Sequence, residues 1–272
     1  MITNRLAAVR NRATVRSKSV SDSWLGRVLT STVLAAAVLL PAQHGGLWPL
    51  AVLVVVVVEL WPLRTVPRSE WGRIWQRQAP QVLMGSGIAM VITTSPRFVT
   101  QAVVTLAYVA WRTWWIGESK LTNSKYDLPN LLLVLAVVYE ALFLMAAVPA
   151  FRMSPWLVLG LVWLASYAAV QAVLAGRGER MAKVMAATWA LLCAEVTWVL
   201  LIWLFTYTLS GGYLLVPQPA LVLTALAYCF GSIYVSQRAG KLSRGRLTEY
   251  LLIGLILIAV VITGTSWKGG TQ

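Results

Sequence analysis

Long apolar runs separated by short polar breaks organise the whole chain. Each run is long enough for a helix that crosses a bilayer, which needs about 17–25 mostly apolar residues. The runs are continuous and do not alternate with a period of two, so they predict helices and not the strands of a membrane barrel. The sequence therefore predicts an all-α, polytopic membrane protein with about nine transmembrane helices, at 24–42, 47–63, 80–95, 98–116, 130–149, 155–175, 183–209, 219–236 and 250–266.

The third run is the weakest of these predictions. It is short and contains Gly85, Ser86 and Gly87. An alternative is that it enters the membrane and returns with the fourth run as a re-entrant hairpin. Both ends of the pair lie on the same side of the membrane in either case, so the predicted topology of the other runs does not change.

Composition excludes the soluble classes of protein. Hydrophobic residues make up 58% of the chain and charged residues 12%, whereas soluble domains have about 25% charged residues. A water-soluble protein of 272 residues has too few charges here to cover its apolar surface. Cys193 and Cys229 both lie inside apolar runs, and His44 is the single histidine. The sequence therefore predicts no disulfide framework and no metal site.

Basic residues fall on alternate sides of the predicted helices. If the N-terminus is cytoplasmic, 20 of the 23 Lys and Arg residues lie in inner segments or at adjoining helix ends, and only Arg97, Arg152 and Lys268 lie outside. The positive-inside rule then predicts a cytoplasmic N-terminus and an external C-terminus. A bacterial cytoplasmic membrane is the expected location, and an organellar inner membrane is the alternative.

The net charge of +14 has an explanation in the same rule. Inner basic segments are attracted to anionic lipids at the cytoplasmic face of the membrane. Those lipids are therefore the expected partners, and no nucleic-acid partner is expected.

Two segments outside the helices have their own patterns. Residues 1–23 are predicted to be a basic N-terminal cytoplasmic segment, and residues 24–272 the helical transmembrane domain. Residues 1–20 hold four Arg, one Lys and no acid. This composition indicates a tail that sets the topology, although an amphipathic helix on the inner leaflet and an organellar transit peptide share it. The loop 64–79 is predicted to hold a short interfacial helix, capped by Ser69, with three apolar residues on one face: Trp71, Ile74 and Trp75.

Motifs for known chemistry are missing from the sequence. There is no phosphate-binding Gly-rich loop, no His-Glu-x-x-His and no Gly-x-Ser-x-Gly. No paired Asp motif is present to hold magnesium and a diphosphate, and the last run contains no lysine for a Schiff base. The sequence therefore identifies no cofactor.

Glu59 and Arg112 are predicted to share a depth in the membrane. Each lies four residues before the inner end of its run, which is about 6–7 Å at a rise of 1.5 Å per residue. An ion pair between them is the simplest interpretation, and separate snorkelling to the interface is the alternative.

Glu140 and Glu195 are predicted to lie near the midplane, on helices that run in the same direction. An ionisable residue at that depth is costly and is a functional-site hypothesis by default. No Lys or Arg lies at the same depth, so an unpaired carboxylate there is expected to be protonated. Together with other polar groups in the layer, the two acids form a predicted proton or cation site, with Tyr167, Gln171 and Tyr228 as further candidates.

The alternative is that each neutral Glu hydrogen-bonds a neighbouring helix and has a structural role only. Ala186, Ala190 and Ala194 recur at every fourth position, which favours close helix packing. Glu195 is adjacent to this stripe, so we expect its side chain to point into the helix bundle.

Three functional hypotheses follow. The first is a small transporter or permease coupled to protons or cations through the midplane acids. The second is a non-catalytic membrane subunit or assembly factor with membrane-protein partners, which explains the missing motifs. The third is a membrane enzyme that acts on lipid or isoprenoid substrates. That hypothesis gains support if inner residues such as Arg112, Glu118, Lys120 and Asp127 converge on one pocket.

Overall fold

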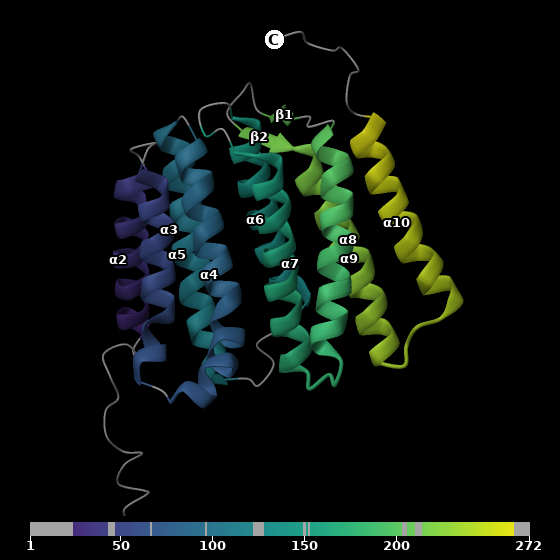
Figure 1. Ribbon diagram of the computed structural model, residues 1–272, viewed down its shortest axis with the longest axis horizontal. Helices are drawn as coiled ribbons and strands as arrows, with labels where there is room; N and C mark the ends of the chain where they lie inside the picture. Colours follow the sequence, from purple (N-terminus) through teal and green to yellow (C-terminus); the bar gives the residue numbers. More distant parts are fainter. Residues whose placement is uncertain are drawn as a thin grey trace, which may run out of the picture.

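The described residues fold into an all-α bundle, and each of the nine predicted apolar runs contains an α-helix. The computed structural model describes residues 24–42, 47–65, 67–95, 97–121, 128–148, 151, 153–202, 206–209 and 214–263. Within these ranges the α-helices are α2 (Trp24–Ala42), α3 (Trp48–Leu60), α4 (Trp71–Thr94), α5 (Phe98–Leu121), α6 (Leu128–Ala147), α7 (Pro155–Gly176), α8 (Ala182–Ile202), α9 (Gln218–Arg238) and α10 (Arg244–Thr263). They stand side by side and roughly parallel to one axis (Figure 1).

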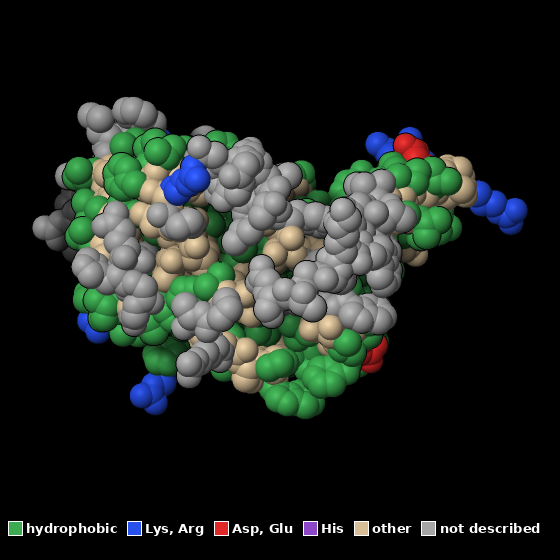
Figure 2. All heavy atoms as spheres, turned by 90° about the horizontal axis from the view of Figure 1, so that it is seen from above, with side chains coloured by type: hydrophobic (Ala, Val, Ile, Leu, Met, Phe, Trp, Pro, Cys, Tyr) green, Lys and Arg blue, Asp and Glu red, His purple; other side chains and the backbone are tan. Residues whose placement is uncertain are grey.

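The described helices support a membrane protein. Four of them, α6 to α9, are long and apolar enough to cross a membrane, judged by length and composition. Large hydrophobic side chains such as Leu106, Trp156 and Leu255 are each 68% exposed. In Figure 2, which looks down on one end of the bundle, hydrophobic side chains cover much of the described perimeter. Such a surface is not compatible with water around the bundle but matches a lipid environment.

The segment before α4 differs from the sequence prediction. Residues Arg68–Glu70 form a short 3-10 helix, η4, and α4 then runs without interruption from Trp71 to Thr94, with Pro80 inside it. The predicted interfacial helix is therefore the first part of α4 and not a separate element. The prediction for the N-terminal segment 1–23 lies outside the described residues.

Small residues allow α4 to pack closely at the centre of the first half of the bundle. A side chain at Gly85 would meet the Cγ1 of Val55 in α3 at 2.6 Å and the hydroxyl of Tyr108 in α5 at 2.9 Å. A side chain at Gly87 would meet Val137 of α6 at 3.1 Å. The glycines that weakened the prediction of this helix are therefore the positions where three neighbouring helices approach its backbone.

A β-hairpin replaces the end of the seventh predicted helix. That run was expected to be helical to residue 209, but α8 ends at Ile202. Strands β1 (Thr206–Leu209) and β2 (Leu214–Pro217) pair in antiparallel fashion. The hairpin lies at the end of the bundle where α10 ends (Figure 1). Thr206 and Thr208 alternate with Tyr207 and Leu209, which is a strand pattern and explains the change from helix.

The core is centred on α6. Its side chains Leu135, Tyr139, Phe143 and Met145 are fully buried. This helix packs against α4, α7 and α9, so it has neighbours on most sides. The tight turn between α7 and α8 uses Gly178 with a φ of 73°, a conformation that favours glycine.

Candidate functional site

Glu140 lines a groove between α4, α5 and α6. The groove has a volume of about 400 Å³, and the Glu140 side chain is partly exposed to it. We call it the Glu140 groove and define it by its lining residues: Met84, Ile88, Val91, Val104, Ala107, Tyr108, Trp111, Leu133, Ala136, Val137 and Glu140.

The spacing of these residues explains why they meet. On α5 and on α6 the lining positions follow the pattern i, i+3, i+4 and i+7, which places them on one face of a helix. The face of α6 runs from Leu133 to Glu140, and the face of α5 from Val104 to Trp111. Helix α4 packs on both of these helices and forms the third wall. The groove is therefore apolar except where Glu140 and the aromatic residues of α5 meet it.

A buried ion pair lies behind the α5 wall of this groove. Arg112 donates from Nε to Oε1 of Glu59 at 2.9 Å, and its Nη2 lies 2.9 Å from the same oxygen. Arg112 also donates from Nη1 to the hydroxyl of Ser31 at 3.3 Å. Glu59 is 5% exposed and Arg112 7%. The pair expected from matching depth is thus present and joins α3 to α5, with Ser31 adding α2.

Tyr108 lies between the groove and the ion pair. Its ring stacks near that of Trp111 with centroids 6.4 Å apart, and its side chain is 2% exposed. It also lies close enough to Arg112 and Glu59 to interact with both charges. Tyr108 therefore interacts with the ion pair and also lines the groove that contains Glu140. The sequence prediction missed Tyr108, although it lies four residues before Arg112 and hence on the same helical face.

Glu195 does not point into the bundle as the alanine stripe predicted. Its side chain is exposed on α8, whereas Ala186, Ala190 and Ala194 are buried. The exposed side of α8 around it consists of large apolar residues: Leu191, Trp198, Val199 and Ile202. Glu140 lines a groove on the other half of the bundle, so the structure does not bring the two acids together.

The remaining candidates lie apart from the Glu140 groove. Tyr167 stacks on Trp163 with ring centroids 5.6 Å apart, in a shallow groove between α7 and α8. Gln171 is half-buried one turn further along α7, and Tyr228 is 36% exposed on α9. None of the three lines the groove that contains Glu140.

A second buried polar cluster joins α6, α7 and α8. The hydroxyl of Tyr139 lies 2.8 Å from that of Ser166 and 3.6 Å from the thiol sulfur of Cys193. Ser166 also donates to the carbonyl of Val162 at 2.6 Å. All three side chains are buried, and no acid takes part. This cluster fits a packing role, because it satisfies polar groups in an otherwise apolar core.

Other chemistry gains no support from the described residues. No three His, Cys, Asp or Glu side chains among them lie close enough to hold a metal ion. The enzyme hypothesis would gain support if Arg112 converged with Glu118, Lys120 and Asp127 on one pocket. Arg112 is instead held in the buried pair, and the other three side chains lie outside the description of the structure.

Comparison with protein-family models, with curated proteins and with solved structures finds no match for this chain. The geometry of the side chains described above is therefore the evidence that bears on function.

Proposed function

We propose that this chain is a nine-span membrane transporter with a cytoplasmic N-terminus, in which Glu140 binds a proton or a small cation. The distribution of basic residues supports the orientation. Two arginines near the proposed inner surface lie against tryptophans, Arg64 over Trp61 at 4.0 Å and Arg68 over Trp71 at 6.0 Å. Such pairs are typical of a membrane interface.

Helix lengths support the count of nine. The weakest predicted run became the second part of α4, which continues as one helix to Thr94 without a turn at Gly85 or Gly87. An unbroken helix favours a full crossing over a re-entrant hairpin. Helix α3 has 13 residues, or about 20 Å, but the 3-10 helix η3 (Trp61–Thr65) continues it by about 10 Å. The two together match a hydrocarbon core of about 30 Å.

The single observation that supports transport is the placement of Glu140. It lies 12 residues from the start of α6, about 18 Å along the helix and so well inside a membrane. Among the described residues no Lys or Arg forms an ion pair with it. The groove of about 400 Å³ is partly open and lined mostly by apolar side chains. We propose that Glu140 exchanges a proton or releases a cation through this opening.

The ion pair between Glu59 and Arg112 lies next to the Glu140 groove and forms the second part of the proposed site. Arg112 and Glu59 form the buried ion pair, and Tyr108 interacts with both of them. Tyr108 also lines the groove that contains Glu140. We propose that ionisation of Glu140 is coupled in this way to the packing of α5 against α3.

Proton movement into proteoliposomes tests this proposal. The purified chain is reconstituted around a pH-sensitive dye, and a pH step or a cation gradient is applied. We expect flux with the unmodified protein and its loss in Glu140→Gln, which keeps the shape of the acid but does not ionise. Glu195→Gln is the matched control, because it removes the same charge from the exposed face of α8. Equal flux from Glu140→Gln and the unmodified protein would contradict the proposal, as would an absence of flux with every gradient tried.

Carbodiimide labelling gives an independent measurement on the same protein. These reagents modify protonated carboxyl groups in apolar surroundings. We expect labelling of Glu140 that falls as the pH rises or as the bound cation is added. Glu59 is expected to stay unlabelled because it is paired with Arg112. Labelling of Glu140 that does not respond to pH or to any cation would count against an exchanging site.

A membrane subunit is the second candidate function, and Glu195 is the observation that favours it. A carboxylate on a lipid-facing helix is costly, so a helix from another protein is a natural cover for the exposed face of α8. Cysteine at Leu191 is expected to cross-link to a partner in native membranes, while cysteine at the exposed Gly160 of α7 serves as the control. Recovery of the chain without any adduct at Leu191 would leave this candidate unsupported.

A further inference from the structure

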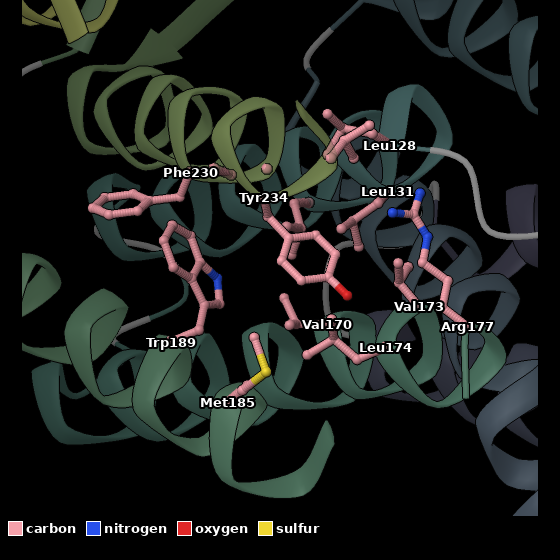
Figure 3. Close-up of a pocket in the computed structure, with 14 residues that line it drawn as sticks. Leu128, Leu131, Val170, Val173, Leu174, Arg177, Met185, Trp189, Phe230 and Tyr234 are labelled. Carbon is pink, nitrogen blue, oxygen red and sulfur yellow. The ribbon is translucent and has the colours of Figure 1, made fainter. Parts of the chain in front are cut away.

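A partly open apolar pocket lies among α6, α7, α8 and α9, apart from the Glu140 groove. Its volume is about 210 Å³, and Figure 3 shows side chains from all four helices converging on it. We call it the α6–α9 pocket. It is lined by Leu128, Leu131, Leu135, Val170, Val173, Leu174, Arg177, Met185, Trp189, Ala227, Phe230, Gly231, Tyr234 and Val235.

One end of this pocket is apolar and the other is polar. Trp189 and Phe230 form an edge-to-face pair with centroids 5.4 Å apart at one end. The guanidinium of Arg177 and the hydroxyl of Tyr234 lie toward the opposite end (Figure 3). Arg177 lies 5.9 Å from the centre of the Tyr234 ring. A ligand that fits both ends has an apolar part and a polar part.

The pocket begins at the level where the four helices begin or end. Leu128 is the first residue of α6, Arg177 follows the last residue of α7, and Tyr234 lies in the last turns of α9. Leu135, seven residues deeper along α6, is about 10 Å further in. The apolar part of the pocket therefore extends from the membrane surface into one leaflet.

Charged side chains lie at the polar end and next to it in the chain. Glu179 accepts a hydrogen bond from Tyr234 at 2.7 Å and forms an ion pair with Arg238 at 3.1 Å. Arg180 and Lys183 are exposed nearby in the chain. Among the described residues no carboxylate lies within ion-pair distance of Arg177, so its charge is available at the pocket mouth.

We propose that the α6–α9 pocket holds one acyl chain of an anionic phospholipid, with the lipid phosphate against Arg177. The volume is below the range of about 300–1,000 Å³ typical of a site for a whole small ligand, so it suits a single chain. The remainder of the lipid stays in the leaflet. Arginine is well suited to a phosphate because it donates two parallel hydrogen bonds. The site is independent of Glu140 and of the proposed transport.

Lipid binding to the purified full chain tests this inference. The protein is delipidated in detergent and its melting temperature is measured with added phosphatidylglycerol, phosphatidylcholine or glycerol 3-phosphate. We expect the largest rise with phosphatidylglycerol, a smaller one with phosphatidylcholine, which has the acyl chains without the net charge, and none with glycerol 3-phosphate, which has no chain. Dissociation constants follow from the dependence on lipid concentration.

Two variants separate the headgroup from the chain. Arg177→Gln is expected to weaken phosphatidylglycerol binding about tenfold, the size of one charge-assisted hydrogen bond. It is expected to weaken phosphatidylcholine binding less, because the choline cation offsets the charge of the same phosphate. Arg180→Gln is the matched control, with the same loss of charge next to the pocket but not in its lining. Ala227→Phe fills the pocket and is expected to abolish the effect of both lipids. Val170→Phe, on a half-buried position, replaces it if Ala227→Phe lowers the yield of folded protein.

Three outcomes would overturn the inference. Phosphatidylglycerol that binds the filled-pocket variant as it binds the unmodified protein places the lipid elsewhere. Equal losses from Arg177→Gln and Arg180→Gln indicate attraction to the basic surface in general. A full effect with glycerol 3-phosphate identifies a phosphate site that does not use the apolar pocket.

Discussion

Replacing Glu59 by glutamine removes the negative charge from a buried ion pair and leaves Arg112 with a positive charge in an apolar surrounding. Both residues are less than 10% exposed, so water does not compensate the charge. Breaking a buried pair from one side typically costs about 3–5 kcal/mol. The hydrogen bond from Arg112 to Ser31 is long, at 3.3 Å, and its acceptor is an uncharged hydroxyl. It therefore recovers little of this loss.

The double variant Glu59→Gln with Arg112→Gln tests whether the two residues interact. Each single change strands one charge, whereas the double change leaves two neutral amides that can hydrogen-bond each other. The free energy of unfolding is therefore expected to fall less in the double variant than the two single losses predict, by at least about 2 kcal/mol. This non-additivity measures the pair itself and not the general cost of altering α3 and α5.

The assay is thermal melting of the purified protein in detergent, followed by the loss of a single monodisperse species. The pair between Glu179 and Arg238 is the matched control, with a distance of 3.1 Å but an Arg238 side chain that is 60% exposed. Arg238→Gln is expected to cost less than about 1 kcal/mol. Additive losses from the two changes at Glu59 and Arg112 would refute the reasoning, as would a loss at Arg238 as large as that at Arg112.

Two further predictions concern packing and topology. Gly85→Ala is expected to lower the free energy of unfolding by about 1–3 kcal/mol, because the new Cβ would lie 2.6 Å from Val55. Gly72→Ala has nothing within 4 Å of the new Cβ, so it is expected to be neutral or to stabilise by up to about 1 kcal/mol. The same melting assay compares the two variants. Reporters fused after Gly212 are expected to be active outside the membrane and those after Gly240 inside, and an internal reading at Gly212 would rule out nine spans.

The position of each helix was predictable because apolar runs and their breaks determine where a helix can lie. The ends were less predictable. Residues 206–209 are apolar enough to extend the preceding helix, but they alternate Thr with Tyr and Leu and pair with β2 instead. Strand pairing depends on a partner segment that follows after the turn, so a pattern read within one run does not contain it.

Depth along a helix was enough to predict the contact between Glu59 and Arg112. Two opposite charges at one level in an apolar layer gain much from meeting, so the chemistry selects the rotation of both helices about their axes. Glu140 and Glu195 also match in depth, but two acids gain far less from contact than an acid and an arginine do. Nothing in their chemistry then determines the direction in which either side chain points, and the packing of the surrounding apolar residues decides it.

The direction of Glu195 was nevertheless contained in the sequence of α8. Successive residues of an α-helix point about 100° apart, because a turn takes 3.6 residues. A residue next to a buried stripe in sequence is therefore turned away from it, and Glu195 follows Ala194 directly. It shares its face with Leu191, Trp198 and Val199, all exposed. Small residues face the neighbouring helix and large ones the exterior. The position of an acid among small or large residues, and not its adjacency to a buried residue along the chain, therefore indicates whether it faces into the bundle or outward.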